Sequence, residues 1–133
     1  MKILFASDSF KGSLTSEQIG HLLTQAAAEI FPQAQTHTLC VADGGEGTME
    51  TVVHALDGTW KTVSVLDPLG NPINARYGLL PGQKAIIEMA EASGLPLVPT
   101  SQRNAAKTSS IGTSVHICDA PDEGIRDITT ASG

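Results

Sequence analysis

The sequence is poor in basic residues. Of its 133 residues, 8 are Lys or Arg and 14 are Asp or Glu, which gives a formal net charge of −6 at pH 7. Binding through nucleic-acid phosphates or anionic lipid requires clustered Lys and Arg, so the composition argues against both kinds of partner. A phosphorylated ligand must therefore be held by a few placed groups and by a metal ion.

Cysteines and long apolar runs are also scarce. Cys40 and Cys118 are too few for a disulfide framework, and neither has a metal-ligand spacing. The apolar run after Met1 ends at Asp8 and is too short for a secretory signal, and no stretch is long enough to span a membrane. The sequence therefore predicts a cytoplasmic protein.

The composition that remains is that of a globular domain. Apolar residues make up 41% of the chain, and 13 Gly with 7 Pro supply turns without reaching the level of a disordered chain. A domain of this length removes roughly two-thirds of its unfolded surface from water, so we expect a real core.

Strand and helix patterns alternate at the start of the chain. Residues 2–7 predict a buried strand, and a capping box at Thr15 predicts the start of an amphipathic helix. A second strand is expected at 36–41 and a second helix from about Thr48. This alternation is typical of an α/β fold with a Rossmann-like parallel sheet core, and we assign residues 1–66 to that core as a βαβαβ-type segment.

The apolar period changes to two near Trp60. Residues 60–80 predict antiparallel strands, and a further strand is expected from Lys84 to Met89, so we interpret 67–98 as a β-rich insertion.

The signals weaken beyond Pro99. There we expect a polar loop over 108–113, a poor helix over 114–120 that Pro121 ends, and a returning strand near 125–130. Residues 99–133 are therefore assigned as an incomplete final segment.

The loop after the first strand carries candidate binding groups. In an open α/β sheet, ligands gather beyond the carboxyl ends of the strands. Lys11 could neutralise a phosphate or a substrate carboxylate, and Ser9 and Ser13 could hydrogen-bond oxygens. The alternative is that Asp8 and the serines form local turns while Lys11 is solvated.

A glycine-rich loop follows the second strand. Its three glycines let the backbone approach a ligand, and its two carboxylates could hold Mg²⁺, bind a polyol or act as a base on a hydroxyl. The alternative is a tight turn in which one acid caps the following helix. The loop consists of Asp43, Gly44, Gly45, Glu46, Gly47 and Thr48.

Other polar stretches are less informative. The segment Glu88–Leu95 suits a short helix with a structural role, and Lys107–Thr113 is either an anion-binding helix start or a common polar loop. The four histidines share no spacing and are interpreted as incidental surface or helix residues.

Several of these stretches, taken together and in order, resemble the bacterial glycerate kinase family. The resemblance covers most of residues 1–113. The matching stretches are Asp8–Leu14, Val41–Thr48, Pro68–Gly70, Ala75–Gly78, Ile87–Ala90, Ala92–Leu95 and Thr108–Thr113.

The resemblance implies ATP- and Mg²⁺-dependent phosphorylation of D-glycerate in the cytoplasm, by a two-domain α/β protein with its active site between the domains. It implies Lys11 and Asp43 as catalytic candidates. Which loop binds glycerate and which binds ATP stays open. The binding candidates that it implies are Asp8, Ser9, Ser13, Gly44, Gly45, Glu46, Gly47, Thr48 and Thr113.

The resemblance weakens after Thr113, and the chain ends where the family continues. We therefore expect an N-terminal fragment that is inactive alone and has exposed apolar faces that favour homo-oligomers. The alternatives are a non-catalytic binding or interaction module and a degenerate gene product.

Overall fold

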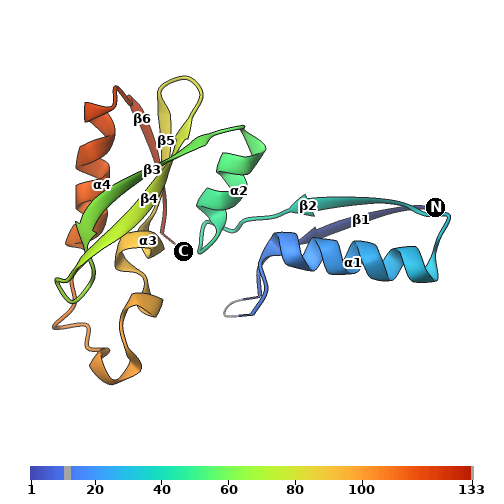
Figure 1. Ribbon diagram of the computed structural model, residues 1–133, viewed down its shortest axis with the longest axis horizontal. Coiled ribbons are helices and arrows are strands. Elements are labelled where there is room, and N and C mark those ends of the chain that lie inside the picture. Colours follow the sequence, from blue (N-terminus) through green and yellow to red (C-terminus); the bar gives the residue numbers. More distant parts are fainter. Residues whose placement is uncertain (11–12, 133) are drawn as a thin grey trace. The chain divides into compact units, whose positions relative to one another are not determined.

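The structure, a computed structural model, describes residues 1–10 and 13–132 and divides the chain into two compact units (Figure 1). The first unit is Met1–Asp43 and the second is Gly44–Gly133. Within the described residues, no helix is long and apolar enough to cross a membrane. The expected mixed α/β class is confirmed, and each unit contains its own sheet.

The first unit is a β–α–β segment. Strands β1 (Lys2–Ser7) and β2 (Gln35–Cys40) pair in parallel, and helix α1 (Ser16–Ile30) connects them. The expected capping box is present: the Gln18 N–H donates to Thr15 Oγ1 at 3.2 Å, and the Thr15 N–H donates to Gln18 Oε1 at 2.9 Å. The start of α1 is therefore fixed by its own sequence.

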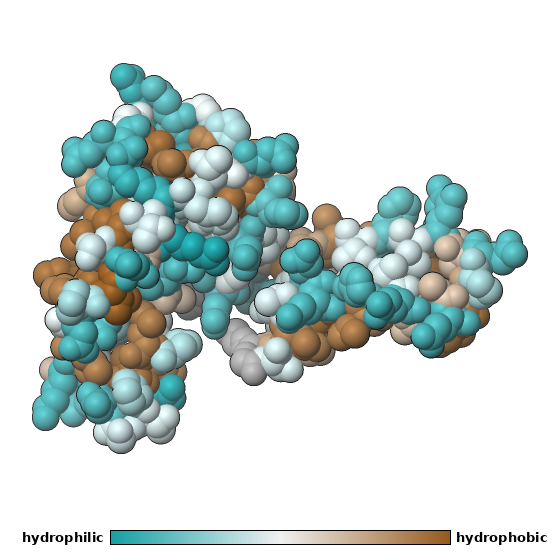
Figure 2. Space-filling model, viewed as in Figure 1, coloured by the Kyte–Doolittle hydropathy of each residue, from teal (hydrophilic) through white to brown (hydrophobic). Residues whose placement is uncertain are grey.

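One face of this sheet is exposed and carries apolar side chains among polar ones. Thr38 lies against α1, because its Oγ1 is 3.2 Å from that of Thr24. Side chains alternate along a strand, and Leu39 pairs in register with Ala6, so Leu39 and Leu4 lie on the face away from α1. Their exposed fractions are 56% and 66%, and apolar surface is visible on this unit in Figure 2. We call Leu4 and Leu39 the exposed apolar face.

The second unit contains a four-stranded mixed sheet in the order β3-β4-β5-β6. The first two pairs of neighbours are antiparallel and β5–β6 is parallel, which confirms the expected antiparallel strands and the returning strand. The strands are β3 (Thr59–Leu66), β4 (Pro72–Leu80), β5 (Lys84–Glu88) and β6 (Asp127–Ala131).

The position of β3 differs from the expected βαβαβ-type segment over residues 1–66. This strand pairs with β4 in the second unit, whereas β1 and β2 form the sheet of the first. The reason is local: Asp67 accepts the N–H groups of Leu69 and Asn71, both at 2.8 Å, and so closes a tight turn between β3 and β4. A hairpin neighbour is then the nearest available partner for β3.

Helices α2 (Thr48–Ala55) and α4 (Ile111–Asp122) cover opposite faces of the four-stranded sheet. A Cβ at Gly78 would lie 2.2 Å from Val53 on α2, whereas the neighbouring Tyr77 ring packs edge-on against His116 on α4, with 5.8 Å between ring centroids. Consecutive strand residues point to opposite faces. The main core cluster consists of Met49, Val53, Tyr77, Ala85, Ile86, Ile87 and Ala120.

The expectations for residues 108–121 are partly wrong. Helix α4 begins at Ile111, inside the expected loop, and includes Pro121 in its last turn. Pro121 removes one backbone donor near the end of α4, which stops at Asp122, just before Gly124 with a φ of 78°. His116, interpreted as an incidental residue, is fully buried in α4.

Candidate functional site

The glycine-rich loop forms a closed turn before α2. Gly44 and Gly47 have φ of 96° and 89°, a backbone region that glycine adopts without the penalty of a Cβ. The Gly44 N–H donates to Thr48 Oγ1 at 3.1 Å, and the Thr48 N–H donates to the Gly45 carbonyl at 3.1 Å. Five predicted site residues, Gly44 through Thr48, are therefore held together in one short turn.

A distant carboxylate completes this turn. Glu88, at the end of β5, accepts the Gly47 N–H at 3.0 Å through Oε1 and at 3.1 Å through Oε2. Its Oε2 also accepts the Met49 N–H at 3.0 Å. Glu88 is only 5% exposed, its hydrogen bond from Met49 is buried, and its hydrogen bonds from Gly47 are partly buried.

Glu88 was missed as a site residue, because the segment Glu88–Leu95 was assigned only a structural role. The available signal was its place: it is the single acid after the apolar run Ala85-Ile86-Ile87, at the carboxyl end of a strand. The residue that it binds lies 41 positions earlier in the sequence, and nothing local indicates that pairing.

The two acids of the loop itself are accessible. Asp43 and Glu46 are both exposed, whereas Gly45 between them is buried. Asp43 is the last residue of the first unit, and Glu46 belongs to the second. Across residues 1–10 and 13–132, no group of three or more His, Cys, Asp or Glu side chains is arranged to hold a metal ion.

The loop after β1 contains a local turn. Asp8 Oδ1 accepts the Ser9 N–H at 2.7 Å, and the Ser13 N–H donates to the Phe10 carbonyl at 2.8 Å. Both contacts are local, and the binding roles proposed for Asp8, Ser9 and Ser13 stay predictions. Lys11, the leading cation of the sequence analysis, lies outside the described residues.

Thr113 lies in a second polar region of the second unit. Its Oγ1 is 2.7 Å from Oγ of Ser93, which joins α4 to the short helix α3 (Met89–Ser93). The Ser109 N–H donates to the Pro68 carbonyl at 3.0 Å. Close by is an open cavity of about 480 Å³, whose lining includes Met89, Ser93, Leu95, Arg103, Thr108 and Ser110.

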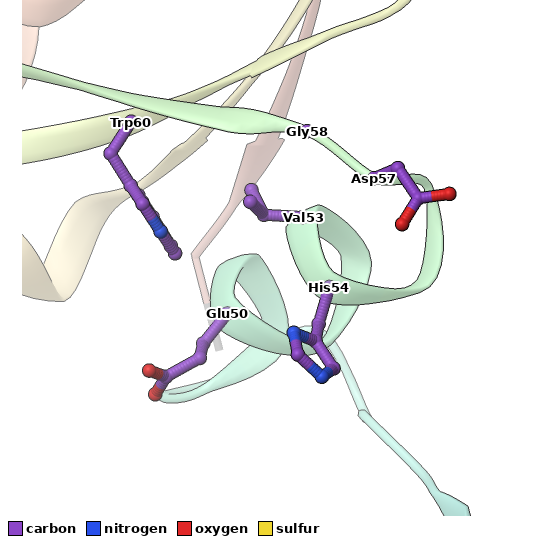
Figure 3. Close-up of a pocket in the computed structure, with 6 residues that line it drawn as sticks. All are labelled: Glu50, Val53, His54, Asp57, Gly58 and Trp60. Atoms are coloured by element: carbon purple, nitrogen blue, oxygen red, sulfur yellow. The ribbon is translucent and has the colours of Figure 1, made fainter.

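A smaller cavity of about 260 Å³ lies between α2 and the start of β3. Figure 3 shows Val53 and Trp60 beside this space, with His54 and Glu50 on the helix and Asp57 in the connecting turn. Arg76 stacks on the Trp60 ring, 4.2 Å from its centroid, and contributes to the packing here.

An ionic network supports α4 against the sheet. The Tyr77 hydroxyl donates to Asp119 at 2.8 Å, and Lys61 Nζ lies 3.1 Å from the same carboxylate and also pairs with Glu123. Burial raises the pKa of Tyr77. Burial opposes ionisation of Asp119 as well, but the hydrogen bonds from Tyr77 and Lys61 lower the pKa of this carboxyl.

Comparisons with known proteins agree on one family. The model of the glycerate kinase family matches residues 3–133. Glycerate kinase of Halalkalibacterium halodurans is 44% identical over 132 residues, and the match covers 98% of this chain and 35% of that protein. Glycerate 2-kinase of Escherichia coli K12 is 42% identical over 134 residues, with 100% and 35% covered.

A solved structure gives the same relationship. A protein of Salmonella typhimurium LT2, described as glycerate kinase 2, superposes with a TM-score of 0.75 at 45% identity. The match covers 98% of this chain and 36% of that one. The chain thus spans about a third of the length of the curated relatives that it matches.

Proposed function

Because the chain belongs to the glycerate kinase family, we propose that it is the N-terminal portion of an enzyme that transfers the γ-phosphoryl group of ATP to D-glycerate. The observation that carries this proposal is the family match over residues 3–133, which includes both predicted site loops. The closed glycine turn before α2 supports it, because such a turn offers a fixed backbone beside exposed carboxylates.

Within this proposal, the loop acids and Lys11 have distinct tasks. Asp43 would act as a base on the reacting hydroxyl or hold Mg²⁺, and Glu46 is the second carboxylate of the loop that would serve either purpose. Mg²⁺ is commonly held by one or two carboxylates together with substrate phosphates and water, so a cluster of three protein ligands is not required. Lys11 neutralises an anionic group of a substrate.

The remaining candidates bind substrate or nucleotide. Ser9 and Ser13 offer hydroxyls close to Lys11 in the sequence, and Thr113 offers one beside the larger cavity. Asp8 supports the first loop through its bond to Ser9.

We further propose that the 133 residues alone do not turn over glycerate. Phosphoryl transfer depends on holding the nucleophile in line with the γ-phosphate and on surrounding the developing charge, so an incomplete set of groups loses most of the effect. The match to only about 35% of each relative supports this expectation.

The function is tested with a chimera. This chain replaces the aligned part of E. coli glycerate 2-kinase, and ADP release is measured with Mg²⁺, ATP and D-glycerate. The proposal expects turnover by the chimera, little or none by the chain alone, and loss of turnover in Asp43→Ala. A well-folded chimera without turnover would favour a non-catalytic binding module.

We also propose a cytoplasmic location and self-association of the isolated chain. The exposed apolar face of the first unit supports self-association, because apolar surface of this kind on a sheet with two strands favours contact with another chain.

A further inference from the structure

The carboxylate of Glu88 occupies a place where helices commonly bind anions. The first N–H groups of a helix lack intrahelical partners and carry a partial positive charge, which attracts phosphate and carboxylate groups. At the start of α2 the donors from Gly47 and Met49 both point at Glu88, with donor–acceptor distances of 3.0 to 3.1 Å.

Helix α2 has no side-chain cap at the residue that precedes it. It has eight residues, which is too short to be stable by itself. Gly47 precedes it and has no side chain to serve as a cap, whereas Thr15 caps α1 within its own sequence. Glu88 supplies the missing cap from β5.

The same contact restrains a loop whose backbone would otherwise sample many conformations. Three glycines in four residues lose much conformational entropy when they are ordered. Glu88 is anchored on the strand that carries the buried Ile86 and Ile87, so its carboxylate is a fixed point for the Gly47 backbone. Fixing Gly47 in turn fixes its neighbours Glu46 and Thr48.

We propose that Glu88 is the positioning residue of the glycine loop, and that its carboxylate fills the start of α2 so that no external phosphate binds there. For its relevance to catalysis this inference rests on the proposed function. Its consequence is that the loop contributes a fixed backbone and the exposed Glu46, while the phosphates of ATP are bound by other groups.

The test uses the amide signals of Gly47 and Met49 in the isotope-labelled 133-residue chain. In Glu88→Ala, both amides should exchange with solvent at least about tenfold faster than in the parent, because each loses a hydrogen bond to a charged acceptor. Added acetate should restore their protection by filling the vacated carboxylate position. Glu88→Asp, which keeps the charge, should retain part of the protection.

Glu91→Gln is the matched control. Glu91 lies on α3, three residues beyond Glu88, and accepts from Arg76 through the backbone N–H at 3.3 Å and through Nε at 3.2 Å. This variant should leave the Gly47 and Met49 amides unchanged. A folded Glu88→Ala chain with unchanged exchange at both amides would overturn the positioning role.

Titration with inorganic phosphate tests the second half of the proposal. In the parent, millimolar phosphate should leave the Gly47 and Met49 signals in place, and in Glu88→Ala it should shift both. Phosphate-dependent shifts in the parent would overturn the inference. None of these measurements requires turnover, so their results do not depend on whether the proposed glycerate kinase activity is correct.

Discussion

Replacing Gly112 by alanine should destabilise the second unit. Gly112 is buried in the first turn of α4, where a Cβ would lie 2.1 Å from the Leu66 carbonyl oxygen and 3.3 Å from the Ala92 Cβ. The first distance is far below van der Waals contact. Because the oxygen belongs to the backbone at the end of β3, it cannot rotate away, and α4 must move off the sheet.

Two opposing effects set the magnitude. Overpacking of a close contact typically costs about 1–3 kcal/mol, whereas a glycine-to-alanine change within a helix gains up to about 1 kcal/mol. The gain is smaller in a first turn, so we expect a net loss of about 1–2 kcal/mol. For a unit of this size, each 1 kcal/mol lowers Tm by about 4–8 °C.

Thermal and urea unfolding followed by circular dichroism measure this change. Ser114→Ala is the control, because Ser114 is exposed on the same helix and its replacement tests helix propensity without a new contact. Ser114→Ala should leave Tm equal or slightly higher. A Gly112→Ala chain as stable as the parent would refute the close approach of α4 to β3.

Two further perturbations address other parts of the molecule. Burial lowers the pKa of His116 despite the nearby charges of Glu91 and Asp119, so below about pH 6.5 the unfolded chain binds more protons and the free energy of unfolding falls as pH decreases. His116→Leu should therefore flatten the dependence of Tm on pH between about pH 7 and about pH 5, whereas replacing the exposed His54 by leucine should not. Equal slopes in the parent and in both variants would contradict the role of His116. In sedimentation velocity, the isolated chain should self-associate at micromolar concentration. Leu39→Lys should shift the chain toward monomer, because Leu39 lies on the exposed apolar face. A parent chain that sediments as a monomer at all micromolar concentrations would be evidence against self-association through this face.

Elements with strong local signals could be predicted from sequence. The capping box at Thr15 and the apolar alternation around Trp60 each involve residues within a few positions of one another. The physical cause of each element therefore lies within the segment that forms it.

The features that escaped prediction depend on distant contacts. Glu88 caps α2 by accepting the N–H of Met49, which lies 39 positions earlier in the sequence. Helix α4 begins at Ile111, where Gly112 packs closely against β3. The burial of His116 results from packing on Tyr77 of β4. A local reading of charge and periodicity contains none of this information.

The candidate site also contains features that depend on local sequence and features that do not. A tight glycine turn was the alternative for this loop, and the bond from the Gly44 N–H to Thr48 Oγ1 closes it within its own sequence. At Asp8 the structure shows a bond from the adjacent Ser9 N–H to the carboxylate, and the choice between a binding loop and local turns stays a prediction. The catalytic roles of Lys11 and Asp43 remain predictions.

Turnover by the chimera with E. coli glycerate 2-kinase tests the central claim most directly. The decisive quantity is the rate of D-glycerate-dependent ADP release by the chimera, compared with its Asp43→Ala variant at equal folded concentration. We predict turnover that falls by at least about a hundredfold in Asp43→Ala, as expected when a group that acts on the reacting atoms is removed. Equal rates in the two proteins would contradict the assignment of the glycine-rich loop to the active site.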